Sequence, residues 1–325
     1  MSGINIPTDS AHLSDLSVAE MIEEFGGTVD GQFAKKSMMR KFAGVKPVRG
    51  TDTLINRRVG RTELAALTAG VRPPATKTEF GRTSVVVDTV LLARDNRSML
   101  NEFQTDFNAR KELAVDHGKE LGKKFDQSML IAGMKGAYAT DAGTPDYNGA
   151  FGDGKNTVLT GAGDELDPDL FYTGIESVIV AMQEEDIDTD ECAIFVRPTQ
   201  HAVLLNNDKL VDRDFTGNGS DFAAGVIKTV MGCPIMPTNR LVNAALVGHE
   251  LSNTRNSDFY DVSATEALTR ALILHPDALL AGETIPLASD IYFDKIERQW
   301  FIDSYMSYGA NFRRQDACGA VRAFS

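Results

Sequence analysis

The feature that most restricts the fold of this 325-residue chain is a long amphipathic stretch between Asp106 and Gly133. Its apolar and small residues recur at spacings of three, four and seven, which places them on one face of a helix. They are Phe107, Ala114, Gly118, Leu121, Phe125, Met129 and Ala132. About 28 helical residues span on the order of 40 Å. The pattern therefore predicts one long helix.

Two glycines, Gly118 and Gly122, interrupt this stretch. Each costs about 1 kcal/mol relative to alanine inside a helix. We expect either a bend at these positions or a closely packed neighbour.

The segment before the long helix divides into two parts. Residues 1–49 hold a capping box at Ser17 and Glu20, which predicts a short helix ending at Gly26-Gly27 and a second one near Phe33 and Phe42. These helices are too short to form a domain, so we expect an N-terminal arm. Residues 50–95 contain β-rich runs around a turn-rich insert, which predicts an extended β-hairpin loop.

The remainder predicts a small α/β unit and closing strands. Residues 96–166 combine the long helix with a Gly-, Asp- and Thr-rich loop, and residues 167–267 alternate helix and strand patterns, beginning with a helix after Asp167-Pro168. Residues 268–325 return to strands. The predicted fold class is α+β.

Charge is strongly segregated along the chain. The formal net charge is −13, which argues against nucleic acid or anionic lipid as a primary ligand. Residues 35–62 carry nine basic groups and one acid, whereas residues 163–191 carry eleven acids and no base. These segments are either two solvated faces or complementary patches that meet between copies of the chain.

The sequence contains no complete motif for catalysis, a cofactor or a metal. The run from Gly149 to Asn156 lacks the Ser or Thr of a phosphate loop, and the acids at 186, 188 and 190 lack the later ligands of a calcium loop. Cys192, Cys233 and Cys318 fit small core residues in a reducing compartment. The sequence predicts neither a signal peptide nor a membrane span.

The order of these segments resembles the HK97-like fold of tailed-phage major capsid proteins, with an N-arm, an extended loop, a spine helix, a peripheral domain and an axial α/β domain. The similarity is greatest to T7-like podoviruses. The local stretches that carry it are residues 24–29 (EFGGTV), 59–62 (VGRT), 230–235 (VMGCPI) and 315–321 (QDACGAV). Asp316 and Cys318 depart from the family's usual closing segment.

The resemblance implies a structural protein, not an enzyme. Such chains assemble as hexamers and pentamers into an icosahedral head around a scaffolding protein, join a portal, and expand as double-stranded DNA enters. Assembly takes place in the host cytoplasm, and the DNA contact is non-specific proximity. No cofactor and no membrane are implied.

Several residues follow as candidates for contacts between subunits. We expect them at the base of the extended loop and in the arm: Arg57, Arg58, Arg61, Glu63, Phe25 and Phe33. Gly118 and Gly122 are the expected bend of the spine helix during expansion. Two alternatives stay open: an encapsulin-like compartment, and an α/β enzyme with acids such as Asp186 or Asp188 in a cleft within residues 165–250.

Overall fold

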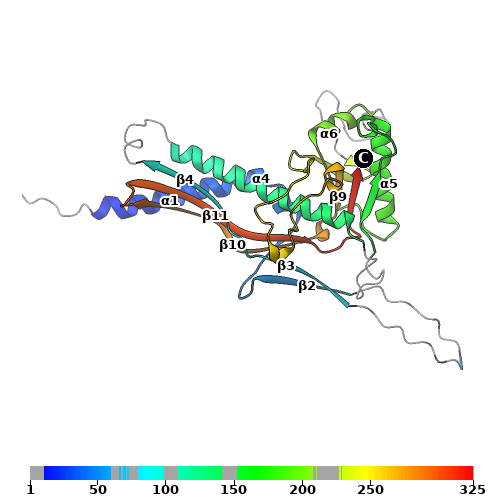
Figure 1. The fold of residues 1–325 in the computed structure, drawn as a ribbon, viewed down its shortest axis with the longest axis horizontal. Coiled ribbons are helices and arrows are strands. Elements are labelled where there is room, and N and C mark those ends of the chain that lie inside the picture. Colours follow the sequence, from blue (N-terminus) through cyan, green and yellow to red (C-terminus); the bar gives the residue numbers. More distant parts are fainter. Residues whose placement is uncertain are drawn as a thin grey trace, which may run out of the picture. The chain divides into compact units, whose positions relative to one another are not determined.

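The computed structural model describes residues 11–59, 66, 69–70, 72, 80–98, 109–140, 152–207, 210, 227 and 229–324, with the backbone alone at 11–22, 24 and 109–110. The chain is mixed α+β, as expected (Figure 1). It divides into two compact units, each built from three segments. Unit 1 contains Met1–Met38, Asp88–Phe125 and Thr284–Tyr308, and unit 2 contains Met39–Val87, Asp126–Glu283 and Gly309–Ser325. No helix in the described part of the chain is long and apolar enough to cross a membrane.

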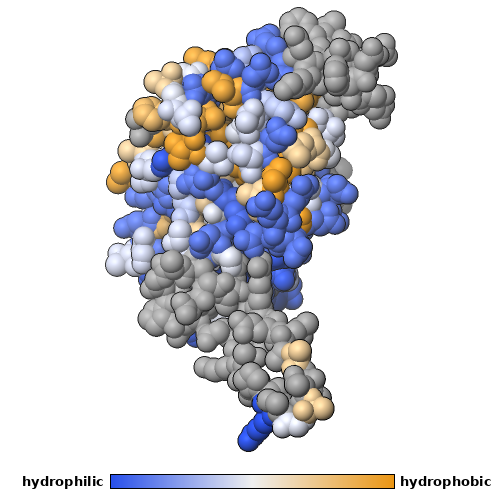
Figure 2. Space-filling view, turned by 90° about the vertical axis from the view of Figure 1, so that its right-hand side faces the viewer, coloured by the Kyte–Doolittle hydropathy of each residue, from blue (hydrophilic) through white to orange (hydrophobic). Residues whose placement is uncertain are grey.

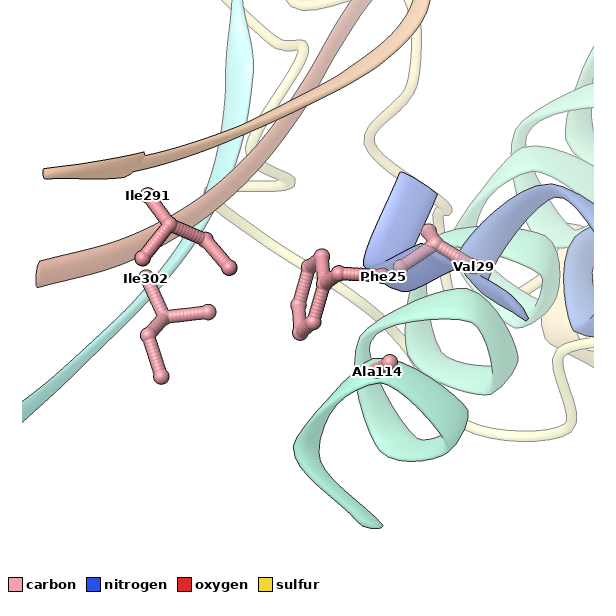
Figure 3. Packing of buried hydrophobic residues seen from close by; sticks show 5 residues of the cluster. All are labelled: Phe25, Val29, Ala114, Ile291 and Ile302. Carbon is pink, nitrogen blue, oxygen red and sulfur yellow. The ribbon is translucent and has the colours of Figure 1, made fainter. Parts of the chain in front are cut away.

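Unit 1 combines two helices with a sheet. Its elements are α1 (Ala11–Lys36), the first part of α4 (Ala109–Tyr138), β4 (Leu91–Ser98), and parts of β10 (Leu279–Asp294) and β11 (Gln299–Phe312). Strands β4 and β11 pair antiparallel. Phe25 and Val29 of α1, Ala114 of α4, and Ile291 and Ile302 of the strands form a buried cluster (Figure 3). The predicted long helix is confirmed as α4.

His117 of α4 is a buried polar connection within unit 1. Its Nε2 lies 2.9 Å from a carboxylate oxygen of Asp95 on β4, and its Nδ1 lies 3.1 Å from the hydroxyl of Ser304 on β11. Because both ring nitrogens have partners, burial leaves neither polar atom of the ring unsatisfied. The residue therefore helps to fix the helix to the sheet.

The first helix of the arm begins before Ser17 and runs through Gly26-Gly27, so both predicted boundaries are wrong. The second predicted helix is confirmed in part, because a short helix spans Met39–Phe42. Phe25, Val29 and Phe33 on successive turns are buried. Full burial of such a side chain contributes about 1.5–3 kcal/mol. That outweighs a cost of about 1 kcal/mol for each glycine, so packing carries the helix through them.

Unit 2 contains the remaining elements. They are α2 (Met39–Phe42), β1 (Val45–Pro47), β2 (Thr53–Val59), β3 (Phe80–Val86), β5 (Lys155–Val158), α5 (Pro168–Gln183), β6 (Ala193–Val196), α6 (Pro198–Leu204), β7 (Thr229–Val230), β8 (Cys233–Pro237), β9 (Thr269–Leu274) and β12 (Cys318–Arg322), with short 3-10 turns η1 (Asp164–Leu166), η2 (Thr254–Asn256), η3 (Glu266–Leu268) and η4 (Pro276–Ala278). The helix predicted after Asp167 is confirmed as α5. Asp167 caps it by accepting hydrogen bonds from the amides of Asp169 and Leu170.

The main sheet of unit 2 has the order β5-β12-β9-β6-β8-β7 and helices on both faces. The later part of α4 packs on one face, where Gly133 approaches Leu274 and Gly136 approaches Cys318. Helix α5 packs on the other face, where Val178 meets Gly319. Strand β5 lies in the stretch that was expected to be a loop. It forms a strand because it pairs with β12, which lies far away in the sequence.

Candidate assembly surface

The base of the predicted extended loop is a two-stranded antiparallel ribbon formed by β2 and β3. Arg57 lies directly opposite Arg82, and Val59 lies opposite Phe80. Residues opposite each other in such a pair present their side chains on the same face. The ribbon therefore has an inner face and an outer face that alternate along each strand.

The inner face of the ribbon packs on the chain itself. Leu54 and Val85 join Val48, Val87 and Leu280 in a buried cluster. A Cβ at position 282 would lie 3.3 Å from a methyl of Leu54, and one at position 309 would lie 2.7 Å from the carbonyl oxygen of Val86. Glycine at these two positions lets the ribbon approach β10 and β11 closely.

The outer ribbon face, defined as Ile55, Arg57, Val59, Phe80 and Arg82, is exposed. Ile55 is 54% exposed, Val59 62% and Phe80 73%. Large apolar side chains that gather on a surface typically mark an interaction site. A two-stranded ribbon is also marginal in water without packing on its faces.

Two arginines face each other across the outer ribbon face. Like charges directly opposite on neighbouring strands destabilise the pair. Arg57 was among the residues predicted from the sequence, and Arg82 was not. The missing signal was the strand register, which joins residues 25 positions apart.

The other loop candidates lie elsewhere. Arg58 is on the inner side of the ribbon, half-buried, and its Nη1 donates to the carbonyl oxygen of Arg313 at 3.2 Å. Arg61 and Glu63 lie outside the described residues. Of the predicted loop contacts in the described part of the chain, Arg57 is the one with an exposed side chain.

One base of the basic segment, Arg40, is neutralised by an acid of the same chain. Arg40 forms a two-pronged ion pair with Glu283, at 3.0 and 3.1 Å. Asp52, the one acid between residues 35 and 62, pairs with Arg255. The hydrogen bond from Arg255, followed by that from Thr53, lowers the pKa of Asp52. Asp52 therefore stays ionised beside Arg255.

The arm candidates are buried inside unit 1. Phe25 packs edge-on against the ring of His117, and Phe33 packs edge-on against Phe125. Both side chains are covered by the chain itself, contrary to the expectation that they face a second copy. Burial of these rings explains why the arm docks on its own unit.

Gly118 and Gly122 both face helix α1. A Cβ at position 118 would lie 2.6 Å from the carbonyl oxygen of Val29 and 2.9 Å from the Cβ of Gln32. At position 122 the corresponding contacts, to Phe33 and Lys36, are 3.6 Å. Of the two reasons that the sequence left open, the close neighbour is present at both positions.

The acidic segment surrounds η1 and α5. We define the leucine–acid patch as Leu166, Asp167, Asp169 and Leu170, all exposed, with Leu166 at 58% and Leu170 at 45%. Asp167 is the cap of α5, and Asp169 accepts a hydrogen bond of 2.9 Å from Asn207. Figure 2 views the molecule from the right-hand side of Figure 1, where α5 lies, and shows apolar side chains at the surface beside hydrophilic ones.

Three observations on the described residues bear on the enzyme alternative, and none of them favours it. Asp186 and Asp188 lie in an exposed turn after α5. A pocket of about 200 Å³ lies between β3, η2 and β11, lined among others by Arg255, Asn256 and Tyr260, and its lining falls outside residues 165–250. Among the described residues, no group of three His, Cys, Asp or Glu side chains is placed to bind a metal.

The three cysteines are buried, free thiols. Burial raises the pKa of Cys192 to about 12 and that of Cys233 to about 11, and it raises the pKa of Cys318 as well. Because the thiolate is the reacting form, we expect all three to resist iodoacetamide at pH 8 in the folded chain. Mass spectrometry should show three adducts only after unfolding; rapid labelling of folded protein would contradict the burial.

No protein-family model and no curated protein matches the chain, but solved structures do. The mature capsid of bacteriophage PhiM1 matches with a TM-score of 0.76 and 24% identity, over 89% of this chain and 87% of that one. The capsid of the cyanophage P-SCSP1u matches with a TM-score of 0.76 and 17% identity, over 89% and 88%. A virus-like particle from Pyrococcus furiosus matches with a TM-score of 0.54 and 13% identity, over 93% and 100%. The chain therefore has the HK97-like α+β fold found in phage capsids, as the sequence predicts.

Proposed function

We propose that this chain is the major capsid protein of a tailed bacteriophage, a shell subunit of the T7-like podovirus type. The observation that carries the proposal is the match of nearly the whole chain to nearly the whole of two phage capsid proteins. A shared fold does not by itself fix function. The exposed outer ribbon face adds support, because a shell subunit needs surfaces that neighbouring copies cover.

The proposal includes the finer assembly features. The chain forms hexamers and pentamers around a scaffolding protein and a portal, and the closed head encloses double-stranded DNA. The head assembles in the host cytoplasm and expands on maturation, with Gly118 and Gly122 as the place where the spine helix adjusts. The net charge of −13 is compatible with a shell that does not bind the phosphates of the enclosed DNA tightly. We assign the N-terminal arm to residues 1–49, the extended loop to residues 50–95, the peripheral domain to residues 96–166 and 268–325, and the axial domain to residues 167–267.

Expression of the chain with and without the phage's scaffolding protein tests the proposal. Negative-stain electron microscopy should show closed, uniform shells, and size-exclusion chromatography should show particles far larger than a dimer or tetramer. A stable small oligomer under all conditions would contradict the proposal and favour the enzyme alternative.

A protein compartment is the second candidate, because a virus-like particle shares the fold. The contents of native particles separate the two. Nuclease-protected DNA supports the capsid, whereas a protein cargo without DNA supports the compartment.

Contacts through the base of the loop give a testable prediction. Arg57→Glu combined with Arg61→Glu should leave the chain folded and soluble but reduce shell yield at least about tenfold, because acids of a neighbour would then face like charges. Lys46→Glu is a matched control, since Lys46 is an exposed base of the same segment that lies outside the ribbon. Circular dichroism checks folding, and sedimentation measures yield. Normal shells from the double variant would contradict the predicted role of these arginines.

A further inference from the structure

We infer that the outer ribbon face of one copy binds the leucine–acid patch of a neighbouring copy. The inference rests on the proposed shell function and names which acids the ribbon arginines meet. Both surfaces belong to the same chain but to different elements, β2–β3 and η1–α5. A contact between two different surfaces of identical copies is heterologous, and repetition of such a contact can close a ring.

The two surfaces are complementary in two properties at once. The outer ribbon face combines Ile55, Val59 and Phe80 with two positive charges. The leucine–acid patch combines Leu166 and Leu170 with two negative charges. Apolar contact can supply the buried centre of an interface, while opposite charges set its register and exclude wrong partners.

Other described surfaces fit the ribbon less well. The acidic turn at residues 184–191 carries charge but no large exposed apolar side chain. The tip of the β10–β11 hairpin exposes Ile296, but Lys295 and Arg298 alternate there with Asp294 and Glu297, so the tip carries no net negative charge. A second ribbon would place arginines against arginines. The leucine–acid patch offers both required properties without a like charge.

Site-directed cross-linking tests the contact directly. One tagged chain carries Ile55→Cys and a second, untagged chain carries Leu170→Cys, and the two are assembled together. The native thiols are buried, so a short bismaleimide should react at the engineered positions. We expect dimers that contain one chain of each type, at least about tenfold above a pairing of Ile55→Cys with Val247→Cys, whose position is 86% exposed and lies outside both surfaces.

A charge swap between Arg57 and Asp169 tests the contact independently. Arg57→Asp and Asp169→Lys should each lower shell yield about tenfold, and the double variant should recover most of it, since the ion pair is restored in reverse. Asp167 stays unchanged because it caps α5. Failure of the double variant to recover yield, while both single variants fold, would contradict the pairing.

The outcomes separate this inference from the proposed function. Shells that form normally but give no more cross-linking than the Val247→Cys control overturn the inference and leave the capsid proposal standing. A chain that never forms shells overturns both. Cross-linking of Ile55→Cys to itself would assign the ribbon to a second ribbon and also overturn the inference.

Discussion

Gly118→Ala should destabilise the chain by about 1–3 kcal/mol, although alanine is the better helix former. The new methyl group would lie 2.6 Å from the carbonyl oxygen of Val29, which is part of the backbone of α1. That oxygen can move only if the whole helix moves, so the cost of overpacking exceeds the gain of about 1 kcal/mol in helix propensity. Denaturant unfolding of the unassembled chain measures the change.

Gly122→Ala is the matched control on the same helix face. Its methyl group would make ordinary contacts at 3.6 Å with Phe33 and Lys36. We expect a gain of up to about 1 kcal/mol from helix propensity alone. Opposite signs for the two substitutions would establish that α1 contacts α4 most closely at Gly118, and equal gains would contradict this packing.

Asp126→Ala should cost about 3–5 kcal/mol, the largest loss that we expect from one exchange of a polar residue. The Asp126 side chain is fully buried, and it lies 2.9 Å from the guanidinium of Arg240 and accepts a 3.1 Å hydrogen bond from the amide of Met39. Removal leaves a mostly buried guanidinium without its counter-charge. Asp126→Asn should lose less, because an amide oxygen can still accept the hydrogen bond from Met39.

Asp52→Ala is the comparison for Asp126→Ala. Asp52 also pairs with an arginine, Arg255, but both side chains are about half exposed. Exposed ion pairs are screened by solvent and contribute little to stability, so this loss should be several times smaller. Similar losses at the two positions would contradict the assignment of Asp126 as a buried anchor. Urea unfolding monitored by tryptophan fluorescence can follow both variants.

Periodic patterns in the sequence predicted the elements whose reasons are local. The apolar stripe of α4 and the Asp167-Pro168 start of α5 depend on residues within a few turns, and the structure places both helices where they were expected. The resemblance of the ordered segments to a capsid fold was likewise enough to predict the architecture.

Tertiary packing decided the features that local rules predicted incorrectly. Gly26 and Gly27 are typical of a helix end, but the buried Phe25 and Val29 around them belong to one continuous helix. Strand β5 has no apolar run of its own and exists because β12, more than 150 residues later, lies beside it.

The candidate surface shows the same limit. Arg57 was visible as one of many basic residues, but its pairing with Arg82 depends on strand register. Exposure likewise separates Arg57 from Arg58, which follows it in the chain but lies on the inner face of the ribbon. Neither property could be derived from composition or charge.

The interleaved order of the two units has a consequence for biosynthesis. Each unit needs a segment that emerges late from the ribosome: Thr284–Tyr308 for unit 1 and Gly309–Ser325 for unit 2. Strand β12 sits between β5 and β9, so a nascent chain without it cannot close the sheet. Each unit can therefore complete its fold only after its late segment has been synthesised, and truncated chains that lack β12 should be degraded by proteases.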